Sequence, residues 1–331
     1  MHHYSPRHAQ KSSGQSPAKV RWSRTTVVCA VAAGLIIPAF AATAARPDNA
    51  TNTPQAAVAA APKSTIVLGA SGGSAIGQLS SKVGTELPQH KFGKLDKKVP
   101  DGKLINMKPN AGVTWRDVAN AKSGSTVYNN LVNWADGLKS RSGTIFFTFN
   151  HEPEGKSSQS SGFGTSADFI AAFRKVRSVF ESRGVENVEY TWNMTGNSFR
   201  VPASSPKAAA KWYPGDAYVD NVATAAYNWN GCGGNGSREW KALGEQAADA
   251  LAFAKSHSKK LILAEWASEA DSRRAQWLTD ARKWLTSNKA SIKAAFYYQS
   301  YDARGCHWAL NTAAEYNAFA AMVNDKANFS S

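Results

Sequence analysis

Short, nearly continuous apolar runs recur along the chain from residue 66 onward. Runs of this length are typical of parallel strands whose two faces are both buried. The interval between the first two runs can hold one further strand, which we expect near Leu87–Phe92. The visible runs are Ile66–Ala70, Leu104–Met107, Thr144–Phe149, Val188–Trp192, Val219–Tyr227, Leu261–Trp266 and Ala294–Gln299.

A second pattern, with apolar residues at every third or fourth position, lies between several of these runs and predicts amphipathic helices. One example is the series Phe169, Phe173, Val176 and Phe180, which Gly184 follows as a helix stop signal. Comparable series run through Trp240, Leu243, Ala247, Leu251 and Ala254, through Trp277, Ala281, Trp284 and Leu285, and through Tyr316, Phe319, Ala320 and Val323.

The alternation of strands and helices predicts the fold class. From Leu104 to Ala294 the strands begin on average about 38 residues apart, as in repeated βα units that build a parallel sheet. Eight such units in residues 65–331 match the size of a (β/α)8 TIM barrel. An open doubly wound sheet would normally carry a phosphate-binding glycine loop after its first strand, and Gly69–Ser74 does not fit that pattern. We therefore expect an α/β protein with a (β/α)8 barrel.

The first 64 residues differ from the rest of the chain. Residues 1–24 contain five basic residues and no acidic one, Thr25–Phe40 is apolar, and small residues with two A-x-A patterns follow. This order predicts a secretory signal peptide over residues 1–44, with an uncleaved membrane anchor as the alternative. Residues 45–64 lack aromatics and any apolar period, which indicates a flexible Ala/Pro-rich linker. The expected localisation is extracellular, or the cell surface if the amino-terminal segment stays uncut.

Charge and composition narrow the choice of partners. The 331-residue chain has a formal net charge of +15, and loss of the five basic residues of the signal peptide leaves +10. A basic surface can hold a protein near anionic polymers such as wall polysaccharide, although a merely soluble basic protein fits as well. The basic residues are scattered, without an Arg/Lys-rich helix interleaved with aromatics, so we expect no nucleic-acid partner. We also expect a monomer with no stable membrane association after signal cleavage.

Export also bears on the cysteines. Cys29 leaves with the signal peptide, and Cys232 and Cys306 remain as a pair in an oxidising compartment. This favours a disulfide over two free thiols. Cys232 follows the predicted sixth strand and Cys306 the eighth, so the bond would bridge over the strand between them.

Two glutamates stand where apolar strands end. Glu152 follows the run Thr144–Phe149, and Glu265 lies near the end of Leu261–Trp266. Active-site residues of TIM barrels lie at the carboxyl ends of the strands, so these two can face each other across the mouth. A carboxylate at such a place is costly unless it is paired with Arg or Lys, or needed for chemistry. Retaining glycosidases use such a pair as acid/base and nucleophile, for which we expect the carboxyl carbons roughly 4.5–6.5 Å apart.

Several stretches resemble secreted actinobacterial members of glycoside hydrolase family 26 (GH26), a family of barrel glycosidases. They are FTFNHEPEG, KWYPGDAYVD, ILAEWAS and AAFYYQSYD with the later CHW. The resemblance covers about residues 66–325, and it implies that Glu152 is the general acid/base and Glu265 the nucleophile. It also implies that His151 contacts the sugar or orients the acid, and that Tyr227 hydrogen-bonds the nucleophile. Packing roles for His151 and Tyr227 are the alternatives.

The resemblance implies a retaining endo-glycoside hydrolase for a β-linked polysaccharide, with no metal or organic cofactor. We expect β-mannan as the first choice, with β-1,3-xylan or mixed-linkage β-glucan as alternatives. Two departures leave the substrate open: Glu154 stands two places after Glu152, and the sixth strand ends in AAYNWNGC without an aspartate. We interpret Glu154 as a loop or subsite residue. A non-catalytic carbohydrate-binding barrel, or a cell-surface polysaccharide-binding protein, is the alternative function.

Four tryptophans lie at or just past predicted strand ends, where indole rings can stack on sugar faces. They are Trp192, Trp229, Trp266 and Trp308. As a group they favour a carbohydrate site, although any single one of them can equally be rim packing.

Overall fold

The computed structural model describes residues 64–331, apart from residues 74, 235–237 and 301–304. The predicted signal peptide, residues 1–44, and all but the last residue of the predicted linker, residues 45–64, lie outside the described residues. In the part of the chain that is described, no helix is both long and apolar enough to cross a membrane.

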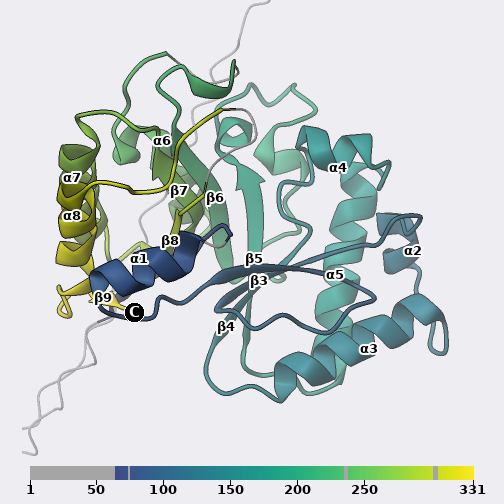
Figure 1. Cartoon of the computed structure of the whole chain (residues 1–331). Helices are drawn as coiled ribbons and strands as arrows, with labels where there is room; N and C mark the ends of the chain where they lie inside the picture. The colour runs from purple at the N-terminus through teal and green to yellow at the C-terminus, as the bar shows by residue number, and fades with distance from the viewer. Residues whose placement is uncertain (1–63, 74, 235–237, 301–304) are drawn as a thin grey trace, which may run out of the picture. The chain divides into compact units, whose positions relative to one another are not determined.

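Nine parallel strands form one curled sheet with helices around it (Figure 1). They are hydrogen-bonded in the order β2-β3-β4-β5-β6-β7-β8-β1-β9. Each apolar run forms a strand close to its predicted position, and the expected eighth strand is present as β2, which confirms the predicted (β/α)8 barrel. The strands are β1 Ile66–Ser71, β2 His90–Lys94, β3 Leu104–Lys108, β4 Ile145–Phe149, β5 Val188–Thr195, β6 Asn221–Asn228, β7 Lys260–Ser268, β8 Ile292–Tyr298 and β9 Phe329–Ser330.

The sheet closes on itself between β1 and β2. At its start β1 pairs with the short strand β9, where Ile66 aligns with Phe329. Further along, the amide of Ala70 donates to the carbonyl of Pro88 at 2.8 Å, and Ala70 forms an isolated parallel bridge with Gln89. One edge of β1 is thus shared by β9 and β2, while its other edge pairs with β8. The carboxyl ends of the strands therefore form a ring around one mouth.

Helices cover the outside of the barrel, with α3 against α5 and α7 against α8. The four helices predicted from apolar periodicity are α5 to α8, although α6 begins three residues after Trp240. The helices are α1 Ala75–Val83, α2 Trp115–Ala119, α3 Thr126–Lys139, α4 Lys156–Ser160, α5 Ser166–Ser182, α6 Leu243–Ser256, α7 Arg274–Ser287 and α8 Ala313–Val323, with short 3-10 turns η1 Gly196–Phe199, η2 Ala209–Lys211 and η3 Cys232–Gly234.

The starts of three helices follow from local sequence. In each, a threonine side chain accepts a backbone hydrogen bond from the third helical residue, whose carboxylate accepts one from the threonine amide. This reciprocal capping box satisfies amides that would otherwise lack partners at a helix start. The pairs are Thr114 with Asp117 for α2, Thr165 with Asp168 for α5, and Thr312 with Glu315 for α8.

The barrel interior holds a small apolar core of its own. Its members lie on the inward faces of the strands and are Leu104, Phe146, Ala223, Ile262, Ala264, Ala294 and Phe296, with Val67 packed against them. The ring of Phe296 leaves no room beside β1: a Cβ on Gly69 would lie 2.5 Å from this ring and 2.4 Å from the carbonyl oxygen of Pro88. Because side chains fill the interior, polar chemistry is confined to the mouth.

Candidate active site at the mouth of the barrel

A β-bulge in β7 turns Glu265 toward the mouth. Thr224 of β6 aligns with Leu263, but the next residue, Ala225, aligns with Glu265, so Ala264 is an extra residue in the pairing. Strict alternation would place Glu265 on the same face as Leu263, which packs outward against the helices. The bulge moves Glu265 to the inner face, as bulges beside active sites commonly re-aim a side chain.

The carboxylate of Glu265 is enclosed, with 18% of its side chain exposed, and is held from two sides. The hydroxyl of Tyr227 donates to Oε2 at 2.6 Å, and the hydroxyl of Ser71 donates to Oε1 at 3.2 Å. Burial raises the pKa of Glu265 above its ordinary value, whereas these two hydrogen bonds lower it. The two hydroxyls therefore favour the charged form that a nucleophile needs.

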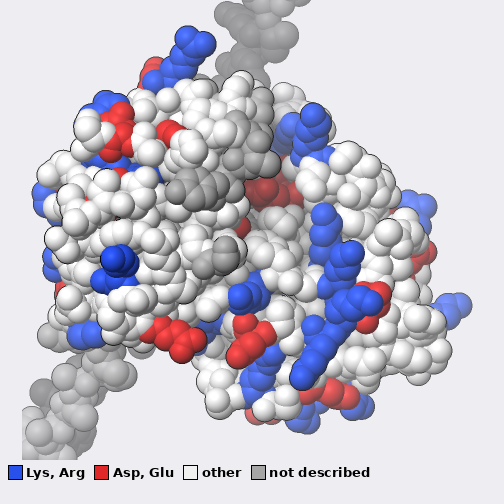
Figure 2. Space-filling model, in the orientation of Figure 1, with Lys and Arg blue, Asp and Glu red and all other residues white. Residues whose placement is uncertain are grey.

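Tyr227 contacts the carboxylate of Glu265 and also lies within range of the charge of Glu152, which follows β4. The strand was predicted to end at Tyr227, and β6 ends one residue later, at Asn228. The contact of Tyr227 with Glu265 is the one that the resemblance implied. Burial above all raises the pKa of Tyr227 well above its ordinary value, and the charges of Glu265 and Glu152 both add to the shift. The hydroxyl is thus a permanent donor near neutral pH, and both carboxylates lie close enough to act on it. Figure 2 shows acidic side chains at the bottom of a hollow on this face.

His90 supports the floor of the site as a neutral imidazole. It is fully buried, with Nδ1 3.2 Å from the carbonyl oxygen of Ala264 and 3.4 Å from Oγ of Ser71. Burial, with a contribution from His151, lowers the pKa of His90 to about 3. Nδ1 of His90 lies 3.8 Å from Oε1 of Glu265. Because the neutral imidazole forms no ion pair, His90 positions the Glu265 carboxylate without neutralising its charge.

Glu152 stands in a tight turn after β4. Both Asn150 and Glu152 have left-handed backbone conformations, with φ of 45° and 48°. Such a conformation is unfavourable for glutamate and persists only where neighbours fix it. Here the amide of Glu152 donates to the carbonyl of Asn193 at 2.9 Å, and its own carbonyl accepts from Gly155 at 3.0 Å. The strain is therefore stored at the residue expected to carry the acid.

Asn150 anchors the same turn from below. Its Oδ1 accepts from the indole of Trp115 at 3.1 Å, and its Nδ2 donates to Ser158 at 3.0 Å. Asn tolerates the left-handed conformation better than most residues, which fits its place at this reversal.

His151 lies between the two strained residues. Its amide donates to Oδ1 of Asn106 at 2.9 Å, and the ring of Phe92 lies 5.1 Å from its own, between centroids. Burial, together with the charge of Lys108, lowers the pKa of His151 to about 4, so the ring is neutral at neutral pH. Its Nδ1 is buried and has no hydrogen-bond partner among the described residues. A neutral ring nitrogen without a partner here suits a contact with a sugar hydroxyl.

Glu154 is buried and ties the turn to the end of β5. Its Oε1 accepts from the amide of Thr195 at 2.8 Å, from the Thr195 hydroxyl at 2.7 Å and from Ser198 at 2.5 Å. Burial raises the pKa of Glu154, and these hydrogen bonds partly offset the shift. This side chain thus fastens the loop that carries Glu152, in keeping with its interpretation as a loop residue.

Two of the four tryptophans lie beside the site. The ring of Trp308 lies 4.9 Å from that of Tyr227, and the ring of Trp229 lies 5.5 Å from Tyr227 and 5.1 Å from Trp308. Trp308 is 1% exposed and forms the wall behind Tyr227, so the prediction that it stacks on sugar is wrong. Trp229 is half-buried. Trp229 is therefore the indole of this cluster with surface left to offer a sugar.

The prediction that Trp192 and Trp266 stack on sugar is wrong, because both are fully buried between the sheet and the helices. Trp192 lies one residue before the inward-facing Asn193, so simple alternation points it outward, toward Tyr213 and Phe253. Trp266 follows the bulged segment of β7 and packs against Trp277 and other outer aromatics. Nearness to a strand end did not by itself place either ring at the mouth.

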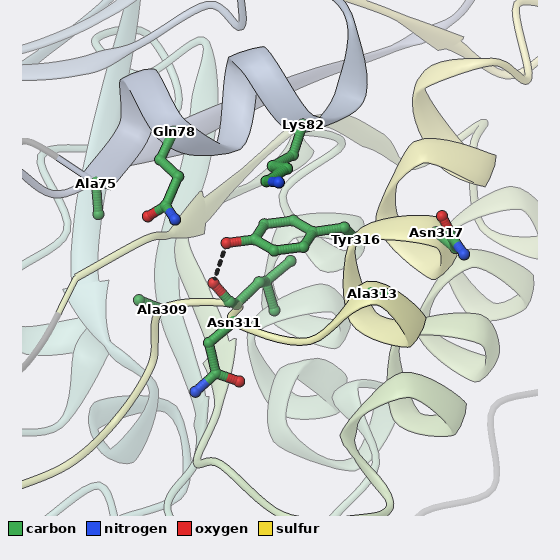
Figure 3. Close-up of a pocket in the computed structure, with 9 residues that line it drawn as sticks. Ala75, Gln78, Lys82, Ala309, Asn311, Ala313, Tyr316 and Asn317 are labelled. Carbon is green, nitrogen blue, oxygen red and sulfur yellow. Dashed lines mark hydrogen bonds between the residues drawn. The ribbon is translucent and has the colours of Figure 1, made fainter.

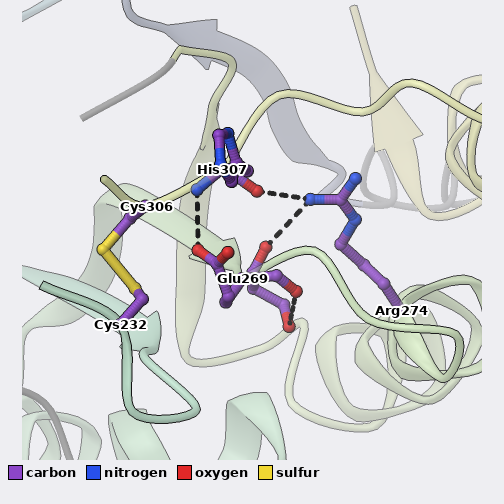
Figure 4. Close-up of a disulfide and its surroundings, with 6 residues drawn as sticks. Cys232, Glu269, Arg274, Cys306 and His307 are labelled. Atoms are coloured by element: carbon purple, nitrogen blue, oxygen red, sulfur yellow. Dashed lines mark hydrogen bonds between the residues drawn. A yellow bond between two sulfur atoms is a disulfide. The ribbon is translucent and has the colours of Figure 1, made fainter. Parts of the chain in front are cut away.

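Cys232 and Cys306 form a disulfide, as predicted (Figure 4). Close to it, the amide of His307 donates to Glu269 at 2.7 Å. Buried Arg274 donates to the carbonyl oxygens of Ser268 at 3.3 Å and His307 at 2.7 Å, and pairs with Glu315 at 2.7 Å. These contacts connect the loops after β6 and β8 with the end of β7. Glu269 lies within 4.8 Å of both sulfurs, but the sulfurs are bonded to each other, so this cluster is not a metal site.

A hollow of about 410 Å³ lies elsewhere, between α1 and α8 (Figure 3). Lys82 and Gln78 of α1 face Tyr316 of α8, whose hydroxyl donates to the carbonyl of Leu310 at 2.6 Å. None of the glutamates at the mouth lines it. We assign this hollow no part in the site.

Four residues that help to hold the two glutamates and their turn were not predicted from the sequence: Ser71, His90, Asn106 and Asn150. Each is buried and polar. A polar residue inside or at the end of an otherwise apolar strand was the available signal, as for Asn106 within LINM. Their partners, however, lie on other strands and depend on the closed barrel.

The disulfide should stabilise the domain rather than take part in chemistry. Its closed loop of 74 residues corresponds to roughly 2–4 kcal/mol of stability, an effect attributed to the constrained unfolded chain. Cys232→Ser with Cys306→Ser should lower Tm by roughly 2–4 °C per kcal/mol lost, measured by calorimetry. Reductant should lower the Tm of the parent protein equally and leave the double variant unchanged. An equal Tm for parent and double variant would contradict this role.

Among known proteins, this chain resembles a curated relative over part of its length. No protein-family model matches the chain. Endoglucanase H of Acetivibrio thermocellus is 28% identical over 157 residues, a match that covers 47% of this chain and 17% of that protein. The chain thus aligns with about a sixth of the length of this curated relative.

Solved structures match over most of the chain. A GH26 β-mannanase from Bacteroides ovatus superposes with a TM-score of 0.55 and 14% identity, over 81% of this chain and 90% of that chain. The catalytic domain of a GH26 endo-β-1,4-mannanase from a Bacillus species gives a TM-score of 0.54 and 15% identity, over 80% and 87%. The resemblance to GH26 that the sequence motifs indicated is therefore confirmed at the level of the fold: this chain is similar to solved GH26 β-mannanase barrels.

Proposed function

We propose that this protein is a retaining endo-glycoside hydrolase of β-linked polysaccharides, with a β-mannan-type backbone as the first choice. The observation that carries the proposal is the pairing of Glu265 with Tyr227 at a mouth that also carries Glu152. The fold shared with GH26 β-mannanases and the local match to Endoglucanase H support a glycosidase acting on β-glycans. β-1,3-Xylan and mixed-linkage β-glucan remain the alternative substrates.

The mechanism follows from the different settings of the two carboxylates. Glu265, whose ionised form is favoured by the hydrogen bonds from Tyr227 and Ser71, attacks the anomeric carbon and forms a covalent glycosyl-enzyme. Glu152 protonates the departing glycosidic oxygen and then removes a proton from the water that releases the sugar. A separation of about 5–5.5 Å between the carboxyl groups is expected for this chemistry and can be measured in a crystal structure.

We also propose that the enzyme acts outside the cell. The basic, apolar and small-residue order of residues 1–44 supports export, and the Cys232–Cys306 disulfide is the kind of bond that persists in an oxidising compartment. Amino-terminal sequencing of the protein recovered from culture medium tests both the export and the cleavage site.

The proposed activity is tested on a panel of β-mannan, β-1,3-xylan and mixed-linkage β-glucan. NMR of the first products should show the β-anomer, because double displacement retains configuration. Binding without any hydrolysis would instead favour a non-catalytic carbohydrate-binding barrel. Release of the α-anomer would exclude Glu265 as a covalent nucleophile.

Replacement of the nucleophile should abolish turnover. Glu265→Ala should lower kcat by about 10⁴-fold or more, because no covalent intermediate can form. Azide should restore activity and give the inverted glycosyl azide. Glu269→Ala is the matched control, since this carboxylate follows on the same strand end but binds the His307 amide. A Glu269→Ala variant that also needed azide would contradict the assignment.

Loss of the acid should depend on the leaving group. Glu152→Ala should slow hydrolysis of the polysaccharide by roughly 10²–10⁴-fold, since its leaving oxygen needs a proton. Aryl glycosides with an acidic phenol need little protonation and should react nearly as fast in the first step. Equal losses of kcat/KM on both kinds of substrate would remove Glu152 from the acid role.

Tyr227→Phe should move the acidic limb of the pH–rate profile. The hydrogen bond from Tyr227 lowers the pKa of Glu265, so its loss raises that pKa further. Glu265 then becomes protonated at higher pH, and the acidic limb of kcat/KM shifts to higher pH with kcat reduced by roughly 10- to 100-fold. Tyr190→Phe, on the outer face of β5, is the control. A shift toward lower pH would contradict the role of the hydroxyl.

A further inference from the structure

A pocket of about 410 Å³ adjoins the proposed active site on the side of β2 and β3. We call it the lysine pocket, because Lys94, Lys97, Lys98 and Lys108 all line it, together with Phe92, Asn106 and His151. Its volume falls within the range of about 300–1,000 Å³ that is usual for small-molecule sites. Figure 2 shows Lys and Arg side chains in a band beside the acidic hollow of this face.

We propose that the lysine pocket binds a sugar unit that carries an anionic group, next to the sugar that is cleaved. The substrate would then be an acidic β-linked polysaccharide. The inference rests on the proposed glycosidase function and specifies the class of glycan on which it acts.

The charges of the pocket are largely uncompensated. Lys97 pairs with Asp96 at 3.3 Å, and both side chains are exposed. Among the described residues, no salt bridge joins Lys94, Lys98 or Lys108 to a carboxylate. Lys108 instead lies over the ring of Phe163, with Nζ 5.3 Å from the centroid. No acidic residue lines the pocket, so its field attracts anions.

Phe92 makes the pocket suitable for a sugar rather than for a bare anion. It is 46% exposed, which makes it the large apolar side chain left open to solvent among the described residues. Its ring packs 4.2 Å from His90 and 5.1 Å from His151, between centroids, so it is fixed in place. An aromatic face held at the rim of a polar pocket offers a stacking surface for a pyranose.

The lysine pocket lies beside Glu152 and Glu265, and this position determines which sugar unit can carry the anionic group. An anionic sugar at the reacting position would meet the negative charges of Glu152 and Glu265. His151, which directly precedes Glu152, lines the lysine pocket, so the pocket borders the turn that carries Glu152. A neighbouring unit of the same chain can therefore place its anionic group over Lys94 and Lys98, while the reacting unit stays neutral.

The test compares two hexasaccharides that differ only in charge. The probes are mannohexaose and a matched β-1,4-linked hexasaccharide in which one unit is mannuronate and the other five are mannose, titrated by calorimetry into the Glu265→Ala variant so that neither is hydrolysed. The acidic probe should bind more tightly, by about 5- to 20-fold at low salt, because each exposed ion pair contributes at most about fivefold. The preference should shrink at high salt.

Matched charge variants then locate the preference. Lys94→Ala with Lys98→Ala should abolish it and leave mannohexaose affinity unchanged. Lys255→Ala with Lys283→Ala removes the same charge from exposed positions on α6 and α7 and should retain it. Phe92→Ala should weaken both probes alike, because it removes the stacking surface.

Three results would overturn the inference. They are equal affinity of the Glu265→Ala parent for the two probes, equal loss of preference in both lysine double variants, and a Phe92→Ala variant with unchanged affinity for both. A separate assay measures hydrolysis of the neutral polysaccharide panel by the unmodified protein, which tests the proposed function independently of the charge preference. A neutral β-mannan cleaved with retention would uphold the proposed function even where the charge preference is absent.

Discussion

A charged carboxylate enclosed by a packed barrel is the constraint on which the rest of the site depends. Glu265 emerges from one of the most apolar strands, and burial alone would favour its protonated form. The hydroxyls of Tyr227 and Ser71 oppose that tendency from β6 and β1, so the ionised form requires two other strands to arrive in register. Closure of the barrel is therefore a condition for the proposed chemistry as well as for stability.

Different contacts place Glu265 and Glu152 at the mouth. Glu265 is placed by a bulge in a regular strand and by hydrogen bonds to the carboxylate itself. Glu152 is placed through its backbone, in a left-handed turn fixed by Asn193 and by the anchored side chain of its neighbour Asn150. Both placements use contacts from other strands, β6 and β1 for Glu265 and β5 for Glu152, so both depend on the closed sheet.

The sequence predicted the strands well because parallel strands buried on both faces leave a local signal, the continuous apolar run. It also predicted the positions of Glu152, Glu265 and Tyr227, since all three stand at strand ends. The prediction failed for Trp192 and Trp266 because the sequence indicated that they lie near strand ends but did not indicate which face of the sheet their side chains occupy. Alternation decides it for Trp192, and the bulge at Ala264 decides it for Trp266. Ser71, His90 and Asn106 were missed because their roles exist only through long-range contacts.

The two sides of the mouth differ in how tightly their side chains are packed and in how much charge they expose. On the side of β6 to β8, a disulfide, buried Arg274 and a cluster of aromatic rings fix the loops around Glu265. On the side of β2 and β3, four lysines, of which Lys97 pairs with Asp96, and the exposed ring of Phe92 line an open pocket. Rigid packing preserves the geometry that bond cleavage needs, whereas exposed charge and an exposed ring can change without disturbing the core. Under the proposed function, substitutions on the β2 and β3 side can change substrate choice without disturbing the packing that holds Glu265 on the other side.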